Sequence, residues 1–269
     1  MSSRPTSESG GSRPSGAADV GRQHRRRGQF GLTMSDLVVI AVAGAAGLAA
    51  GMPLSRLTEL VPPSRVPSPE APGRGRTGAA RAEAPPWWGI GLVTAALFMA
   101  AAVRFGADWA LPAYLVFFAA LVVVSLVDVQ SRVIPTRVVG PAILLCSGLL
   151  AVAAAAHHDW SRLGTSLLGA VLAGGSLLTV HLVTPAGMGF GDVRLATLIG
   201  LALGWLSVGT VALGMFLALL FAAAVGVGLR RLRGGTGGDV PLGPYLAAGA
   251  VVAVLFGDQI IRWYAGMAG

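Results

Sequence analysis

Two aspartates, Asp128 and Asp192, are the residues of this chain whose type and position best suit chemistry. Each stands where a long apolar run meets a polar break. A carboxylate beside an apolar run is costly to maintain, and such residues usually serve in proton transfer or at a substrate site. Either aspartate could instead begin or end a helix or pair with a nearby arginine, Arg132 or Arg194. Two of them at comparable positions favour a functional interpretation.

Residues that interrupt helices stand beside both aspartates. Ile134-Pro135 follows Asp128, and proline prevents the helix from continuing. Three glycines precede Asp192: Gly187, Gly189 and Gly191. Glycine permits unusual backbone dihedrals and lets a second backbone approach closely. We therefore expect an extended peptide to be able to reach this site.

The composition is that of a membrane protein. Of the 269 residues, 54% are apolar and only 12% are charged, and the mean hydropathy is +0.70. A soluble domain would have about twice that charged fraction. The net charge of +8 comes from arginines in the N-terminal part and beside the apolar runs. No basic–aromatic pattern accompanies them, so we expect a lipid bilayer and no nucleic acid as a partner.

The apolar residues form eight runs, of which the first is the weakest. They are Leu37–Leu54, Trp87–Val103, Trp109–Val127, Val138–Ala156, Leu163–Val183, two short runs within Leu195–Leu229 and Leu242–Ile261. The runs have helical length and lack the alternation of strands. We therefore predict an all-α fold, a polytopic membrane bundle of about eight spans, with the first span left open.

The chain divides into three parts by composition. Residues 1–33 are rich in Ser, Gly, Pro and Arg and are predicted to be a disordered basic tail. Residues 34–86 combine the weak first run with a Pro- and Arg-rich loop. Residues 87–264 form the predicted membrane-embedded domain. The only cysteine, Cys146, lies in an apolar run, so the chain cannot build a cysteine zinc site.

The number of runs between the aspartates predicts their side of the membrane. Two runs separate Asp128 from Asp192, so both return to the same face. That face receives six arginines: Arg132, Arg137, Arg194, Arg230, Arg231 and Arg233. The opposite loops receive three: Arg104, Arg162 and Arg262. Because positive charge favours the inner side, we expect the aspartates at the cytoplasmic face. The side of the N-terminal tail stays open.

Three segments resemble those of the type IV prepilin peptidases, a family of membrane aspartyl proteases. Asp128–Pro135 resembles the family's Asp-x5-Ile-Pro pattern, Gly189–Leu195 its Gly-x-Gly-Asp-x-Lys-Leu, and Pro241–Ala247 its Pro-Phe-Gly-Pro-Phe-Leu-Ala. The resemblance covers about residues 87–260. Arg194 stands where the family usually has lysine, which keeps the charge but changes the donor geometry.

The resemblance implies a peptidase with Asp128 and Asp192 as its catalytic pair. One carboxylate takes a proton from water and the other, protonated, donates to the scissile carbonyl. The substrate is a prepilin or pilin-like precursor with a short basic leader, and the site lies at a bacterial plasma membrane. Neither metal nor cofactor is expected, and the oligomeric state is not indicated. Positioning of the substrate is expected from six residues: Gly189, Gly191, Arg194, Ile134, Pro135 and Pro244.

Two other functions remain as alternatives. A proton-coupled transporter could use Asp128 and Asp192 as a relay. The presenilin type of intramembrane protease also contains Gly-x-Gly-Asp, but has Tyr before its first aspartate where this chain has Val127. Many prepilin peptidases carry two Cys-x-x-Cys pairs in an N-terminal loop associated with N-methyl transfer. Residues 55–86 contain no cysteine, so N-methyl transfer is left open.

The arginine distribution gives a first testable prediction. A reporter that is active only in the periplasm should be inactive when fused after Arg233 and active when fused after His158, because these positions fall on opposite sides of the predicted bundle. The reverse pattern would contradict a cytoplasmic site.

Overall fold

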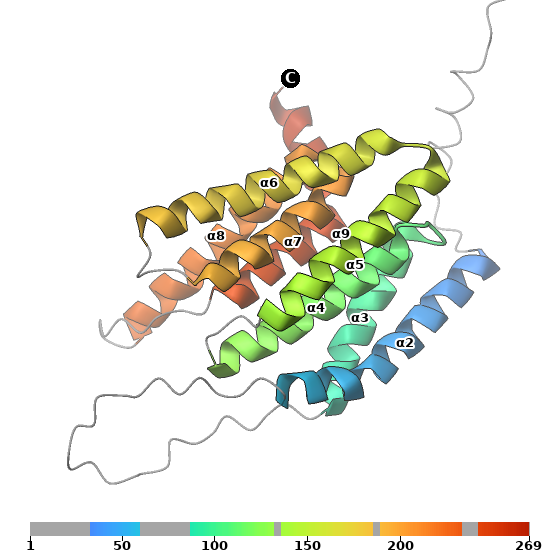
Figure 1. Ribbon diagram of the computed structural model, residues 1–269, viewed down its shortest axis with the longest axis horizontal. Coiled ribbons are helices and arrows are strands. Elements are labelled where there is room, and N and C mark those ends of the chain that lie inside the picture. Colours follow the sequence, from blue (N-terminus) through green and yellow to red (C-terminus); the bar gives the residue numbers. More distant parts are fainter. Residues whose placement is uncertain (1–32, 60–86, 132–135, 185–188, 233–241, 269) are drawn as a thin grey trace, which may run out of the picture.

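The computed structural model describes residues 33–59, 87–131, 136–184, 189–232 and 242–268 (Figure 1). This part of the chain consists of eight helices and no strands, which confirms the all-α prediction. The helices are α2 (Met34–Glu59), α3 (Trp87–Phe105), α4 (Leu111–Ser131), α5 (Thr136–His157), α6 (Trp160–Val183), α7 (Phe190–Leu206), α8 (Val208–Leu232) and α9 (Gly243–Ala268). The predicted tail, almost all of it, and most of the predicted loop at 55–86 lie outside the described residues.

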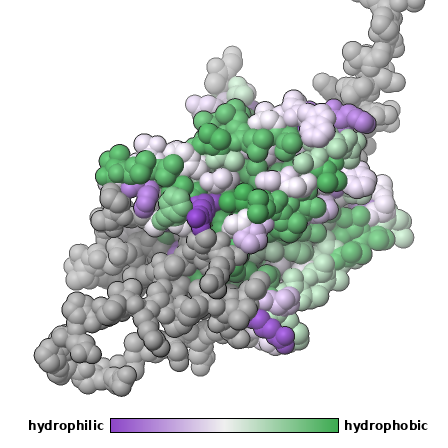
Figure 2. All heavy atoms as spheres, viewed as in Figure 1, coloured by the Kyte–Doolittle hydropathy of each residue, from purple (hydrophilic) through white to green (hydrophobic). Residues whose placement is uncertain are grey.

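The length and composition of the helices fit a membrane. Seven of the eight are long and apolar enough to cross one, and they include the weak first run, in Met34–Arg56. The exception is α7, which has 17 residues. Large apolar side chains that would be anomalous in water are exposed on the outer surfaces, and they cover much of the described face in Figure 2. The chain is therefore a multi-pass membrane protein.

The helix boundaries follow the predicted breaks, but several helices extend beyond their apolar runs. Leu195–Leu229 is divided at Ser207, where α7 ends and α8 begins, as the excessive length of that run predicted. However, α8 continues to Leu232, beyond the expected end of the run. Likewise, α9 extends to Ala268, past the predicted end at Ile261. A helix can extend beyond its apolar run because its backbone groups remain paired in water as well as in lipid.

Helix α4 lies at the centre of the bundle and contacts α2, α3, α5, α7 and α9. Its side chains Tyr114, Phe117 and Phe118 are fully buried. The Tyr114 hydroxyl donates a hydrogen bond of 2.8 Å to the carbonyl oxygen of Ala202, which ties α4 to α7. This packing fixes the helix whose last turn carries Asp128.

Helices α6 and α7 pack backbone against backbone in opposite directions (Figure 1). A Cβ atom added at Gly169 would lie 2.4 Å from the carbonyl oxygen of Gly200 and 2.9 Å from Cα of Gly204. The Ser166 hydroxyl donates 2.6 Å to the carbonyl oxygen of Leu201. Such small residues let helices associate in a membrane, where apolar burial gives little drive. The contact sets the position of α7 and therefore of Asp192.

The first run belongs to the bundle through the same kind of contact. Gly47 and Gly51 of α2 lie against the backbone of Ala95 and Gly91 in α3, and an added Cβ would come within 2.5 and 2.7 Å of their Cα atoms. The alanine and glycine content that made this run weak in hydropathy is what allows it to pack so closely.

We predict that Gly169→Ala destabilises the protein, because its methyl group would overlap the backbone of α7. Overpacking costs about 1–3 kcal/mol, so the melting temperature in detergent should fall by about 3–10 °C. The control is Gly175→Ala on the same helix, where no atom lies within 4 Å of the added Cβ. It should melt at or above the wild-type temperature, since alanine favours helices. Equal melting of the two variants would contradict the close contact.

Candidate active site

Asp128 is a buried carboxylate held by the start of another helix. It lies in the last turn of α4 and is only 4% exposed. The backbone N–H of Gly243, the first residue of α9, donates a hydrogen bond of 2.9 Å to its Oδ2 atom. The first N–H groups of a helix have no partner within it, and a helix N-terminus attracts negative charge. The start of α9 therefore stabilises a carboxylate that the end of α4 disfavours.

Gly243 is a site residue that the sequence analysis did not single out. A Cβ atom there would lie 2.7 Å from Oδ2 of Asp128 and 3.1 Å from its Cγ. Only glycine leaves room for the carboxylate to approach the backbone this closely. Pro244 follows in the first turn of α9, where its missing N–H costs nothing. The glycine between two prolines in Pro-Leu-Gly-Pro was the available sign of a special backbone position. The segment does not say which helix approaches this glycine.

Asp192 stands at the start of its own helix, whereas Asp128 stands at the end of α4. It lies in the first turn of α7 and is half-buried. Its carboxylate accepts a hydrogen bond from the backbone N–H of Gly189, the residue that precedes the helix. An acidic side chain that reaches back to the cap residue in this way stabilises a helix start. Both aspartates are therefore held at helix N-termini, Asp192 within its own helix and Asp128 across a contact.

The two carboxylates interact electrostatically. Asp192 lies outside the seven helices that are long enough to span a membrane. Burial raises the pKa of Asp192 to about 6; the negative charge of Asp128 adds to the rise, and the hydrogen bond from Gly189 opposes it. A proton on one carboxyl group is thus favoured by the charge of the other, which is the condition for sharing one proton between them.

The other predicted positioning residues are partly described. Gly189 has φ −74° and ψ 144°, values that any residue adopts, and Gly191 lies in α7. Neither glycine therefore uses the unusual dihedrals that glycine permits, and the access of a peptide to this backbone stays a prediction. Arg194 places its guanidinium 5.0 Å from the ring centre of Phe190, whose ring also contacts His181. Three predicted residues, Gly187, Ile134 and Pro135, lie outside the described residues.

The opposite end of the bundle carries a separate polar group. Asp108 precedes α4, and its Oδ1 lies 3.3 Å from Nε2 of His157 at the end of α5. The length of α4, about 30 Å, separates this pair from Asp128. Within the described residues, no group of three or more His, Cys, Asp or Glu side chains could hold a metal ion. The absence of metal and cofactor stays a prediction.

Comparison with known proteins finds a family match over a region that contains both aspartates. The type IV leader peptidase family matches residues 115–230. The prepilin leader peptidase/N-methyltransferase of Pseudomonas aeruginosa is 37% identical over 188 residues, which cover 67% of this chain and 61% of that protein. The protein of the same name from Bacillus subtilis is 35% identical over 182 residues, 66% of this chain and 68% of that protein.

This chain belongs to the type IV leader peptidase family. The region matched to the leader peptidase family contains Asp128 and Asp192. Gly243 lies beyond the end of this region. A third relative, from Aeromonas hydrophila, is 33% identical over 65% of the chain and 60% of its own length. The similarity thus spans about 60–68% of the length of these relatives. No solved structure matches the chain.

The contact between Gly243 and Asp128 leads to a prediction for this leader peptidase family member. Gly243→Ala should lower the rate of leader cleavage by about a hundredfold, because a methyl group would displace the Asp128 carboxylate. The control is Gly266→Ala on the same helix, where no atom lies within 4 Å of the added Cβ. Cleavage in detergent, measured beside the melting temperature, separates displacement from unfolding. Normal cleavage by a folded Gly243→Ala would contradict the role given to this contact.

Proposed function

We propose that the protein is a membrane aspartic endopeptidase that removes the short basic leader from type IV prepilin or pilin-like precursors. The observation that carries the proposal is the pair of coupled carboxylates, Asp128 and Asp192, at one end of the bundle. Family membership supports the same activity, since the relatives are named prepilin leader peptidases. We propose residues 87–264 as the peptidase domain.

The mechanism follows from one proton shared between the two aspartates. The ionised carboxylate removes a proton from a water molecule, and the resulting hydroxide attacks the scissile carbonyl. The protonated carboxyl group donates its proton to the carbonyl oxygen as the tetrahedral intermediate forms. The carboxyl group that took the proton from water then gives it to the amide nitrogen, and the other carboxylate takes a proton from one hydroxyl of the intermediate as the C–N bond breaks. This releases the amine and restores one proton on the pair. The roles of Asp128 and Asp192 in the first step are interchangeable in this description, because the pair titrates as a unit.

Positioning of the peptide is assigned to residues around the two helix starts. Gly189 is exposed just before α7, so a substrate can lie beside the backbone that caps Asp192. Arg194, held against Phe190, offers a positive charge one turn further. Pro244 lies next to the amide that binds Asp128. We propose these residues together with Gly191, Ile134 and Pro135 as the substrate-positioning set.

We propose that the active site faces the cytoplasm from a bacterial plasma membrane. The electrostatic effect of Asp128 on Asp192 supports a position of both carboxylates at the same end of the bundle. The arginine distribution favours the cytoplasm for that end. The relatives also carry the name N-methyltransferase, and our proposal is restricted to the proteolytic reaction.

The proposal predicts that Asp128→Asn and Asp192→Asn each abolish cleavage of a membrane-embedded precursor. The loss should be about a thousandfold or more, and the double variant should be no worse than either single one, because the two groups act as a unit. The precursor and its product are separated by size after incubation with each purified variant.

The control for this experiment is Asp159→Asn. Asp159 caps α6 and pairs with Arg162, with a distance of 3.0 Å between Nε and Oδ2. Asparagine caps helices as well as aspartate does, so cleavage should stay close to the wild-type rate. Substantial cleavage by either active-site variant would remove the aspartic mechanism and favour the transporter alternative.

A further inference from the structure

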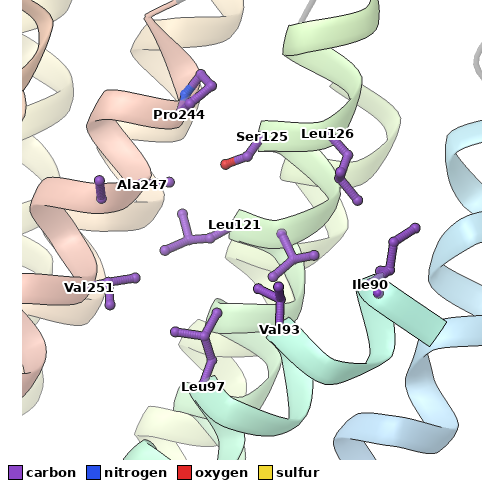
Figure 3. Close-up of a pocket in the computed structure, with 12 residues that line it drawn as sticks. Ile90, Val93, Leu97, Leu121, Ser125, Leu126, Pro244, Ala247 and Val251 are labelled. Atoms are coloured by element: carbon purple, nitrogen blue, oxygen red, sulfur yellow. The ribbon is translucent and has the colours of Figure 1, made fainter. Parts of the chain in front are cut away.

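An apolar groove lies between α3, α4 and α9 (Figure 3). Its volume is about 340 Å³, and Ser125 carries the only polar side chain among the residues that line it. Figure 3 shows α9 on one side and α3 on the other, with α4 between them. The other lining residues are Gly, Ala, Pro, Val, Leu and Ile. The groove therefore suits an apolar occupant.

The floor of the groove leads to the candidate active site. Leu121 and Ser125 line it from α4, and Asp128 follows at a spacing of three residues. Positions separated by four and then three residues lie along one face of a helix. Asp128 therefore lies on the same face of α4 as Leu121 and Ser125. On α9, Pro244 lines the groove directly after Gly243, whose amide binds Asp128. Lining residues of the groove therefore stand next to Asp128 along α4 and next to its amide donor on α9.

Beyond the far end of the groove, an ion pair joins α3 and α9. The guanidinium of Arg104 on α3 binds the Asp258 carboxylate on α9. Leu97 and Val251 line the deep end of the groove, and each precedes its member of this ion pair by seven residues, about two helical turns. The same spacing on both helices means that α3 and α9 run side by side in the same direction and are joined about two turns beyond the groove.

We propose that this groove binds the apolar helix of the substrate that continues into the membrane from the cleaved bond. A peptide segment at membrane depth must pair its own backbone groups, so the occupant is helical. Two turns of a helix occupy on the order of 1,000 Å³, far more than the groove, so only one face of the helix is received. The inference rests on the proposed function, since it assigns the continuation of the same substrate.

Continuity with the site favours a substrate helix over a lipid chain. A substrate that continues from the scissile bond at Asp128 into the bilayer would contact Ser125 and then Leu121. The neighbouring residues Val93 and Leu92 of α3 allow a matched test. Both are 55% exposed, but only Val93 lines the groove. Substitution of either should leave the fold intact, because neither side chain is buried.

The test compares Val93→Trp with Leu92→Trp on a pilin precursor reconstituted in liposomes. The indole of Val93→Trp would fill the groove, so KM for the precursor should rise about tenfold, with kcat changed less. Leu92→Trp should stay within about twofold of wild type. Equal KM values for the two variants, both with wild-type melting temperatures, would overturn the inference.

A photo-crosslinking residue placed at 93 or 92 in the Asp192→Asn background gives a direct measurement. Position 93 should capture the apolar helix of the uncleaved precursor, and position 92 should not. Capture of lipid alone, or equal capture at both positions, would overturn the groove assignment. Cleavage of the same precursor by the wild-type protein tests the proposed function separately, so failure of the groove leaves that result unchanged.

Discussion

The hydrogen bond from the Gly243 amide to Asp128 is the constraint on which the site depends. A buried carboxylate at the end of a helix faces the negative end of its own dipole and has little water around it. The start of α9 compensates with an unpaired amide and a dipole of the opposite sense. Because the donor belongs to the main chain, the arrangement needs two whole helices in register rather than one matching side chain.

That requirement explains how the bundle is packed. α4 is enclosed on several sides and tied to α7 by the Tyr114 hydroxyl, so its last turn is placed precisely enough to meet α9. α7 is placed by a different contact, the glycine backbone of α6. Asp128 and Asp192 therefore belong to two helices that are held by different contacts. Asp128 lies at the end of α4, and Asp192 lies at the start of α7. Their electrostatic coupling is a property of the tertiary structure, with 63 residues of chain between them.

Hydropathy and breaks in the sequence predicted most of the fold. They also singled out the two aspartates as candidate site residues on one face. The division of Leu195–Leu229 was predictable because one span cannot use that many residues. The role of Gly243 was not, since nothing in its local sequence says which helix end lies against it. The glycine content before Asp192 did not predict the local dihedrals, because glycine also occurs at ordinary helix starts, as at Gly189 and Gly191. The groove needs three helices at once, and no single run encodes it.

The separation of 115 residues between Asp128 and its amide donor has a consequence for biogenesis. Chains are made from the N-terminus at about 5–20 residues per second, so Gly243 appears on the order of ten seconds after Asp128. α4, α6 and α7 can enter the membrane and pack while α9, the last of the described helices, is still missing. Asp128 in a nascent chain thus lacks this amide donor until the start of α9 has been made. Under the proposed function, cleavage of a precursor begins only after that point.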